Sequence, residues 1–156
     1  MSEDEIRPVC KNRRARFQYE VLETVEAGLV LMGSEVKSMR QGRANLSDSY
    51  AFIRGGEAWL RGAHIDVYPP ANQFNHEPTR ERKLLLNRRE IARLGSKLRE
   101  RGLTLVPLQM YFRDGHAKVE LALARGKRVH DKRQTIAKRE SDRRLRSITK
   151  RQGRRR

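Results

Sequence analysis

Apolar and polar residues alternate along several short stretches of the chain, a pattern typical of β-strands with one buried face. Phe17, Tyr19 and Val21 alternate with polar residues in this way, and an apolar run over residues 29–32 follows shortly afterwards. Gly28 separates the two stretches, and glycine favours tight turns. We therefore interpret the two stretches as the strands of a hairpin that turns at Gly28.

Two further hairpins are predicted later in the chain. Residues 50–53 and 58–60 are apolar and flank a Gly-Gly-Glu sequence, which favours a turn. Residues 103–112 and 118–124 flank an Asp-Gly turn. Proline lacks the backbone donor that a central strand needs, so Pro107 predicts an edge or a bulge in the first strand of that pair.

Two helices are predicted between these strands. Ser34 can cap a short helix over residues 35–40. Asn87 can cap a second helix over residues 88–101, whose apolar residues Ile91, Leu94 and Leu98 recur at helical spacing. Residues 66–82, with three prolines, are expected to form a long loop.

These elements predict a mainly β protein with about six strands. Short antiparallel strands with inserted helices are typical of a small β-barrel of the oligonucleotide-binding type. A split α+β sandwich fits the same pattern nearly as well. We expect a flexible arm over residues 1–14, which has few core-type side chains, then a barrel domain over residues 15–125 and a basic tail over residues 126–156.

The basic residues concentrate in that tail. The 156-residue chain has a formal net charge of +17. Residues 1–124 hold 21 Lys and Arg against 16 Asp and Glu, whereas residues 125–156 hold 15 against 3. This excess predicts a polyanionic partner, nucleic acid before an anionic membrane surface. Because the tail has few apolar residues, we expect disorder in isolation and a helix on an RNA that neutralises its arginines.

The sequence offers little for catalysis or metal binding. The four histidines are scattered, and the nucleotide-binding, zinc-protease and nucleophile motifs are absent. Cys10 is the only cysteine and cannot build a zinc site or an internal disulfide. No apolar run approaches the roughly 20 residues that span a bilayer. We therefore expect a cytoplasmic protein that is not an enzyme, needs no cofactor or metal and does not enter a membrane.

Cations and aromatic residues are interleaved, as in many RNA-binding proteins. Lys37 and Arg40 are three residues apart and share one face of the first predicted helix. The aromatic residues on predicted strands are Tyr19, Tyr50, Phe52 and Trp59. Core packing is the simpler explanation for most of these rings, because half of the positions on a barrel strand face inward.

Three motifs carry a resemblance to a known family. Residues 33–40 read GSEVKSMR, residues 82–87 read RKLLLN, and residues 126–133 read GKRVHDKR. In this order and spacing, the chain resembles the SmpB family, the SsrA-binding (tmRNA-binding) proteins of bacteria, from about Asn12 to Ile148.

The resemblance implies a barrel that grips the tRNA-like domain of transfer-messenger RNA (tmRNA). It implies delivery of that RNA to stalled ribosomes for trans-translation, in which the nascent peptide is tagged and the ribosome is rescued. The expected partners are tmRNA and the ribosome, mainly small-subunit rRNA around the decoding centre and the mRNA channel. EF-Tu and alanyl-tRNA synthetase are expected to act through the same RNA.

The resemblance also implies two sets of site residues. The tail residues expected to sense an empty mRNA channel are His130, Asp131, Lys132, Arg133 and Ile136. Glu26 is expected to accept a hydrogen bond from a base or a 2′-hydroxyl, since an acid repels phosphate. With Lys37 and Arg40 added from the helical pattern, the expected RNA-binding residues are Tyr19, Glu26, Lys37, Arg40, Tyr50, Leu85, Asn87, Lys118, Arg125, Lys127 and Arg128.

The chain departs from the family pattern at several positions, and two rival functions remain. Phe17 stands where a histidine is frequent, so a polar contact is not expected there, and Arg13, Arg125 and Arg128 stand where lysine is common. A general RNA chaperone or ribosomal protein would bind RNA according to charge and length alone. An RNA-modifying or RNA-cleaving enzyme would use His130 and Asp131.

Overall fold

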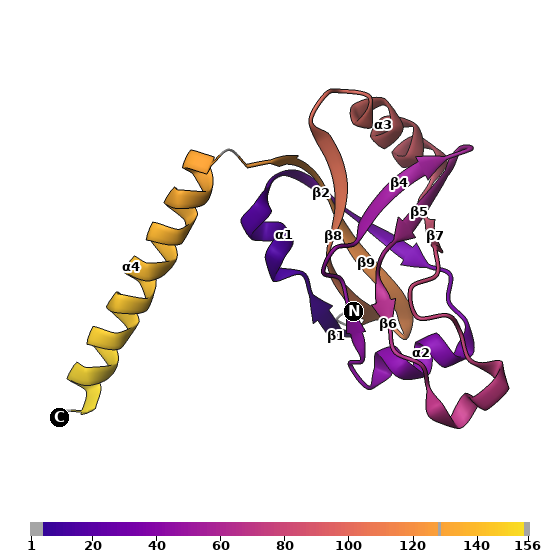
Figure 1. Cartoon of the computed structure of the whole chain (residues 1–156), viewed down its shortest axis with the longest axis horizontal. Helices are drawn as coiled ribbons and strands as arrows, with labels where there is room; N and C mark the ends of the chain where they lie inside the picture. The colour runs from indigo at the N-terminus through magenta and orange to yellow at the C-terminus, as the bar shows by residue number, and fades with distance from the viewer. Residues whose placement is uncertain (1–4, 128, 155–156) are drawn as a thin grey trace. The chain divides into compact units, whose positions relative to one another are not determined.

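The structure is a computed structural model that describes residues 5–127 and 129–154 (Figure 1). The chain divides into two compact units, one ending at Gly126 and the other beginning at Lys127. Among its described residues, the second unit has one long helix, α4 (Val129–Arg154). The first unit carries the sheet and the shorter helices.

A seven-stranded antiparallel sheet forms the body. The strand order is β1-β8-β4-β5-β7-β2-β9, and β8 also pairs with β9, which closes six of the strands into a ring. The ring is completed between β4 and β8 by the single pair Ala51 and Leu105. The strands are β1 (Ile6–Lys11), β2 (Tyr19–Leu29), β4 (Tyr50–Arg54), β5 (Glu57–Arg61), β7 (Arg82–Leu85), β8 (Leu103–Arg113) and β9 (His116–Gly126).

Short elements connect these strands. A small second sheet pairs β3 (Ala44–Asn45) with β6 (His64–Ile65). The helices of the body are α1 (Arg13–Gln18), α2 (Gly33–Arg40), the 3-10 helix η1 (Pro69–Phe74) and α3 (Arg88–Leu98). Helices α2 and α3 lie at opposite ends of the barrel (Figure 1). The predicted mainly β barrel with inserted helices is confirmed, and the alternative of a split sandwich is not observed.

The first predicted hairpin is wrong, because β2 is one continuous strand of 11 residues. Gly28 lies inside this strand and not at a turn. A Cβ at this position would lie 3.2 Å from the Cβ of Leu85 on β7, so the glycine permits a close approach of two strands. Phe17 belongs to α1.

The N-terminal stretch also differs from expectation. Within the stretch predicted to be a flexible arm, residues 6–11 form β1 and pair with β8 in antiparallel register. Asn12 then anchors the chain, because its side-chain amide donates to the carbonyls of Leu46 and Pro107 at 3.2 and 2.9 Å. Its side-chain oxygen accepts from the amide of Ala15 and caps α1.

The other elements follow the sequence pattern closely. Helix α2, the β4–β5 hairpin and the β8–β9 hairpin are all present. Helix α2 begins at Gly33, however, so Ser34 lies inside it and the prediction that Ser34 caps it is wrong. The register of β8 shifts between Pro107 and Gln109, where a bulge was expected. Helix α3 ends at Leu98, three residues before the predicted end.

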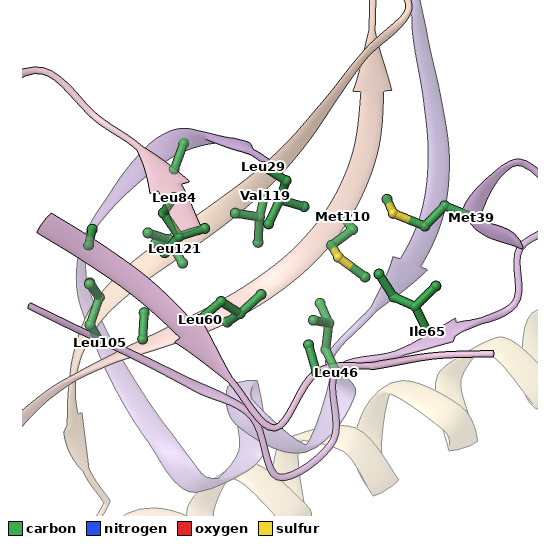
Figure 2. Close-up of a cluster of buried hydrophobic side chains, with 14 of the residues drawn as sticks. Leu29, Met39, Leu46, Leu60, Ile65, Leu84, Leu105, Met110, Val119 and Leu121 are labelled. Atoms are coloured by element: carbon green, nitrogen blue, oxygen red, sulfur yellow. The ribbon is translucent and has the colours of Figure 1, made fainter. Parts of the chain in front are cut away.

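The core fills the inside of the barrel (Figure 2). Its side chains come from the inward-facing positions of the strands, from α2 and α3, and from the segments that connect these elements. They bury apolar surface at roughly 25 cal/mol per Å², which is the main force that holds the sheet closed. The labelled members are Leu29, Met39, Leu46, Leu60, Ile65, Leu84, Leu105, Met110, Val119 and Leu121.

Polar groups inside this unit fasten α2 to the barrel. Glu35 on α2 pairs with Arg82 on β7 and with Arg80 just before it. Arg82 also donates to the carbonyls of Ala63 and Pro78 at 2.7 and 2.9 Å. One buried guanidinium therefore links α2 and β7 to the turn between β5 and β6 and to the segment that precedes β7.

Candidate nucleic-acid interface

The register of four strands places a row of residues on the outer face of the barrel. Leu85 on β7 lies opposite Gly28 on β2, and Gly28 lies opposite Lys118 on β9. Lys118 in turn lies opposite Tyr111 on β8. Glu26 is two residues from Gly28 on β2, so its side chain is on the same face. The structure thus places Glu26, Leu85 and Lys118 on one outer face of the sheet.

Glu26 is held by two residues that the sequence reasoning missed. The hydroxyl of Tyr111 donates to Oε2 of Glu26. Nε of Arg113 donates to the same oxygen at 3.0 Å, and the two side chains form an ion pair. Burial, followed by the hydrogen bond to Glu26, raises the pKa of Tyr111 to about 12. Tyr111 therefore stays protonated and remains a donor at neutral pH.

Leu85 projects into solvent at the edge of this row, with 54% of its surface exposed. An exposed leucine on a short strand is free to pack on a ring or a base. The core residue Leu84 precedes it and points inward. Successive side chains of β7 point to opposite faces of the sheet, so this short strand contributes one leucine to the core and the next to the surface.

Asn87 follows β7 by two residues and begins α3. Its side-chain oxygen accepts from the amide of Glu90 at 2.8 Å, which confirms the predicted helix cap. The amide nitrogen of Asn87 takes no part in that bond. The residue can thus hold the helix with one end of its side chain and offer a donor with the other.

Tyr19 and Tyr50 meet at a second place on the barrel. Both line a hollow of about 290 Å³ together with Asn12, Arg14 and Gln18. Arg61 donates to the hydroxyl of Tyr50 at 3.1 Å. Phenol rings beside arginines are suited to stacking on unpaired bases.

Basic residues lie at the end of β9 that pairs with the start of β2. The register pairs Tyr19 with Gly126, and Glu20 with Arg125. Arg125 is exposed on β9, and Lys127 follows the end of that strand. Arg128 lies outside the described residues.

Lys37 and Arg40 belong to a different element, α2. The ammonium of Lys37 lies 5.5 Å from the centre of the Tyr68 ring, and the guanidinium of Arg40 lies 5.0 Å from the centre of the Phe112 ring. Both side chains remain exposed. Their contact with rings is a cation–π interaction within the body, which positions two charges at its surface.

The predicted tail residues all lie in the N-terminal part of α4. Arg133 and Ile136 are three residues apart, and both are exposed. The backbone places His130, Asp131 and Lys132 in the same turns of the helix.

Within the part of the chain that the structure describes, no group of His, Cys, Asp and Glu is arranged to hold a metal ion. None of the described helices is both long enough and apolar enough to cross a membrane. Burial raises the pKa of the Cys10 thiol to about 11, so it is not an activated nucleophile.

The fold and its outer face define a class, a β-barrel RNA-binding protein. The family model described as "SmpB protein" matches residues 9–151, and the chain belongs to the SmpB family. This is a family of RNA-binding proteins and not of enzymes.

Several relatives of this chain are SsrA-binding proteins. An SsrA-binding protein from Desulforudis audaxviator is 57% identical over 145 residues, which cover 93% of this chain and 95% of the relative. Another from Acidothermus cellulolyticus is 58% identical, over 88% of this chain and 86% of the relative. A solved structure described as "tmRNA-SmpB: a journey to the center of the bacterial ribosome" is 47% identical, with a TM-score of 0.67, over 83% of this chain and 94% of that one.

Proposed function

We propose that this protein binds the tRNA-like domain of tmRNA and delivers it to stalled ribosomes for trans-translation. The observation that carries the proposal is the shared outer face of Glu26, Leu85 and Lys118 in a chain 57% identical to an SsrA-binding protein. The proposed activity is binding and delivery of an RNA, so these residues form contacts with the RNA and catalyse no reaction.

The body makes the specific contacts. Leu85 offers an apolar surface to a base, Lys118 offers a charge to a phosphate, and Glu26 and Asn87 offer an acceptor and a donor to base edges or sugars. Tyr19 and Tyr50 form a second stacking area. The remaining proposed RNA contacts are cationic, from Lys37, Arg40, Arg125, Lys127 and Arg128.

The tail acts on the ribosome. We propose that residues 126–156 enter the vacant mRNA channel and contact small-subunit rRNA around the decoding centre, where His130, Asp131, Lys132, Arg133 and Ile136 test whether message is present. The arginine-rich composition supports this, since a helix of this kind is stabilised when phosphates neutralise it. EF-Tu and alanyl-tRNA synthetase then meet this protein through the same RNA, in the cytoplasm.

Recovery of the protein from its native cells at high salt tests the binding partner. High salt removes contacts that are only electrostatic. Sequencing of the bound RNA is expected to give one dominant tmRNA. A broad mixture of RNAs would contradict the proposal and favour a general RNA chaperone.

Removal of residues 127–156 tests the tail. The truncated protein is expected to retain most of its binding to the tRNA-like domain, since it loses only the contacts of Lys127 and Arg128 there, and to lose tagging of nascent peptides on stalled ribosomes. A control with Arg154, Arg155 and Arg156 alone replaced by Gln is expected to keep tagging, because the sensing residues remain. Tagging by the truncated protein would refute the proposed role of the tail.

A further inference from the structure

The contacts of Glu26 are concentrated on one of its two carboxylate oxygens. The Tyr111 hydroxyl and Nε of Arg113 both donate to Oε2, and Nη2 of Arg113 lies 3.0 Å from the same atom. None of these contacts uses Oε1. The side chain of Glu26 is about one-third exposed, so the carboxylate lies at the surface and not in the core.

Tyr111 reaches Glu26 from the other side of β9. It lies on β8, opposite Lys118, whereas Glu26 lies on β2, opposite Glu120. Only 6% of the surface of Tyr111 is exposed, and its neighbours Met110 and Phe112 point into the core. The Tyr111 ring is therefore held on the outer face by the sheet, and its hydroxyl is presented to the carboxylate.

Arg113 completes the arrangement. Its guanidinium lies 5.7 Å from the centre of the Tyr111 ring, so the ring orients the cation that pairs with Glu26. The cation also offsets the negative charge of Glu26 on a surface that is to receive a polyanion.

We propose that Tyr111 is a positioning residue for RNA recognition, which together with Arg113 fixes the Glu26 carboxylate so that Oε1 accepts a hydrogen bond from the bound RNA. This proposal rests on the proposed function, RNA binding by this face. Tyr111 does not contact the RNA itself but acts through Glu26. A free glutamate loses rotamer freedom when it binds, whereas a glutamate already fixed loses little. Removal of the Tyr111 hydroxyl should therefore lower the affinity of the protein for the RNA.

A purely structural role makes a different prediction. If the bond between Tyr111 and Glu26 served only to join β2 to β8, its loss would lower stability and leave RNA affinity unchanged in the folded protein. A double-mutant cycle on RNA affinity separates the two roles, because residues that act as a unit are not additive.

The experiment uses the full-length protein and a transcript of the tRNA-like domain of tmRNA at one fixed salt concentration. The variants are Tyr111→Phe, Glu26→Gln and the two combined. Tyr68→Phe is the matched control, since it removes a hydroxyl away from Glu26 and keeps the ring that lies under Lys37. Arg113→Lys is a second variant that keeps the charge and removes Nε as a donor.

Tyr111→Phe is expected to weaken binding by about 3- to 10-fold, the range for ordering one side chain on binding. The double variant is expected to bind no more weakly than Glu26→Gln alone. Arg113→Lys is expected to weaken binding in the same direction, and Tyr68→Phe to bind like the wild type. The dependence of affinity on salt should stay the same for Tyr111→Phe, because no phosphate contact is lost.

Two results would overturn the proposal. In the first, Tyr111→Phe binds like the wild type while Glu26→Gln binds weakly. This result would refute the positioning role but would not contradict the proposed function. Fully additive effects would refute it as well. If neither Glu26→Gln nor Asn87→Ala weakens binding, the proposed RNA-binding face itself is wrong, which is a distinguishable failure.

Discussion

The carboxylate of Glu35 and the guanidinium of Arg82 form an ion pair that is closed off from solvent, with side-chain exposures of 0% and 1%. Both groups have further partners, since Arg80 donates to Glu35 and Arg82 donates to two backbone carbonyls. Removal of one member leaves a buried charge without its counterion. Because this network joins α2 to β7, it also supports the segment that carries Leu85 and Asn87.

Glu35→Gln is therefore expected to destabilise the body by about 3–5 kcal/mol, the range for breaking a buried pair from one side. Urea unfolding followed by circular dichroism measures the change. Glu81→Gln is the matched control, because Glu81 pairs with Arg54 and Arg61 at the surface and its loss should cost far less. Equal effects of the two variants would contradict the role assigned to Glu35.

The same network predicts a pH dependence of stability. Burial opposes ionisation of Glu35, but hydrogen bonds from Arg80, the Met32 amide and Arg82 outweigh it, so its pKa lies below the usual value of 4.5. A lowered pKa gives stability that is present above the unfolded-state value and is lost as the pH falls through the folded-state value. Wild type should lose free energy of unfolding more steeply than Glu35→Gln between about pH 5 and pH 2. Parallel curves would contradict this prediction.

Local signals in the sequence predicted local structure well. The Asn87 cap depends on residues three apart, and the two later hairpins depend on turn sequences between adjacent strands. The β2 strand was misread because Gly28 looks like a turn in isolation. A glycine is needed at this position because Leu85 approaches it closely. Leu85 is distant in sequence, so a local pattern contains no information about this contact.

The candidate site shows the same limit. The family resemblance supplied Glu26, Leu85 and Lys118, but not Tyr111, which is 85 residues from Glu26 in sequence. Only the register of β8 on β9, and of β9 on β2, brings the two side chains together. The residues next to a tyrosine in an apolar strand do not indicate whether its ring packs in the core or its hydroxyl contacts a carboxylate at the surface.

Cys10 provides a test of how β1 is docked. Burial, partly opposed by a backbone hydrogen bond with Met110, raises the pKa of its thiol from 9.0 to about 11. At pH 8 the thiolate is then about 100-fold scarcer than in an unfolded chain, since two pKa units separate the states. Reaction with a disulfide reagent should be slower by about that factor in native protein than in urea. Equal rates would mean that β1 is not paired with β8.

Asn87 tests whether a capping residue also binds RNA. Asn87→Ala should cost about 1 kcal/mol of stability through loss of the cap and should also weaken RNA binding. Asn87→Ser keeps a cap oxygen and removes the amide donor, so stability should be retained while affinity for the tRNA-like domain falls about 3- to 10-fold. Thermal unfolding and RNA titration of the two variants measure both effects. Wild-type affinity in Asn87→Ser would limit the role of this residue to the helix.

We expect the basic tail to contribute mainly to binding of RNA of any sequence and the barrel to contribute mainly to specific binding of the tRNA-like domain. Removal of residues 127–156 takes away 14 of the 36 Lys and Arg, so binding to an unstructured homopolymer RNA should fall steeply. The salt dependence should fall with it, by about 0.7 in the slope for each lost phosphate contact on single strands. Binding to the tRNA-like domain should change much less, because only Lys127 and Arg128 are lost from the proposed contacts and the outer face of the barrel is intact. Titrations of both RNAs across a salt series measure these slopes. If the truncated protein lost both RNAs in proportion, charge and not the shape of the RNA would determine binding, as in a general RNA chaperone.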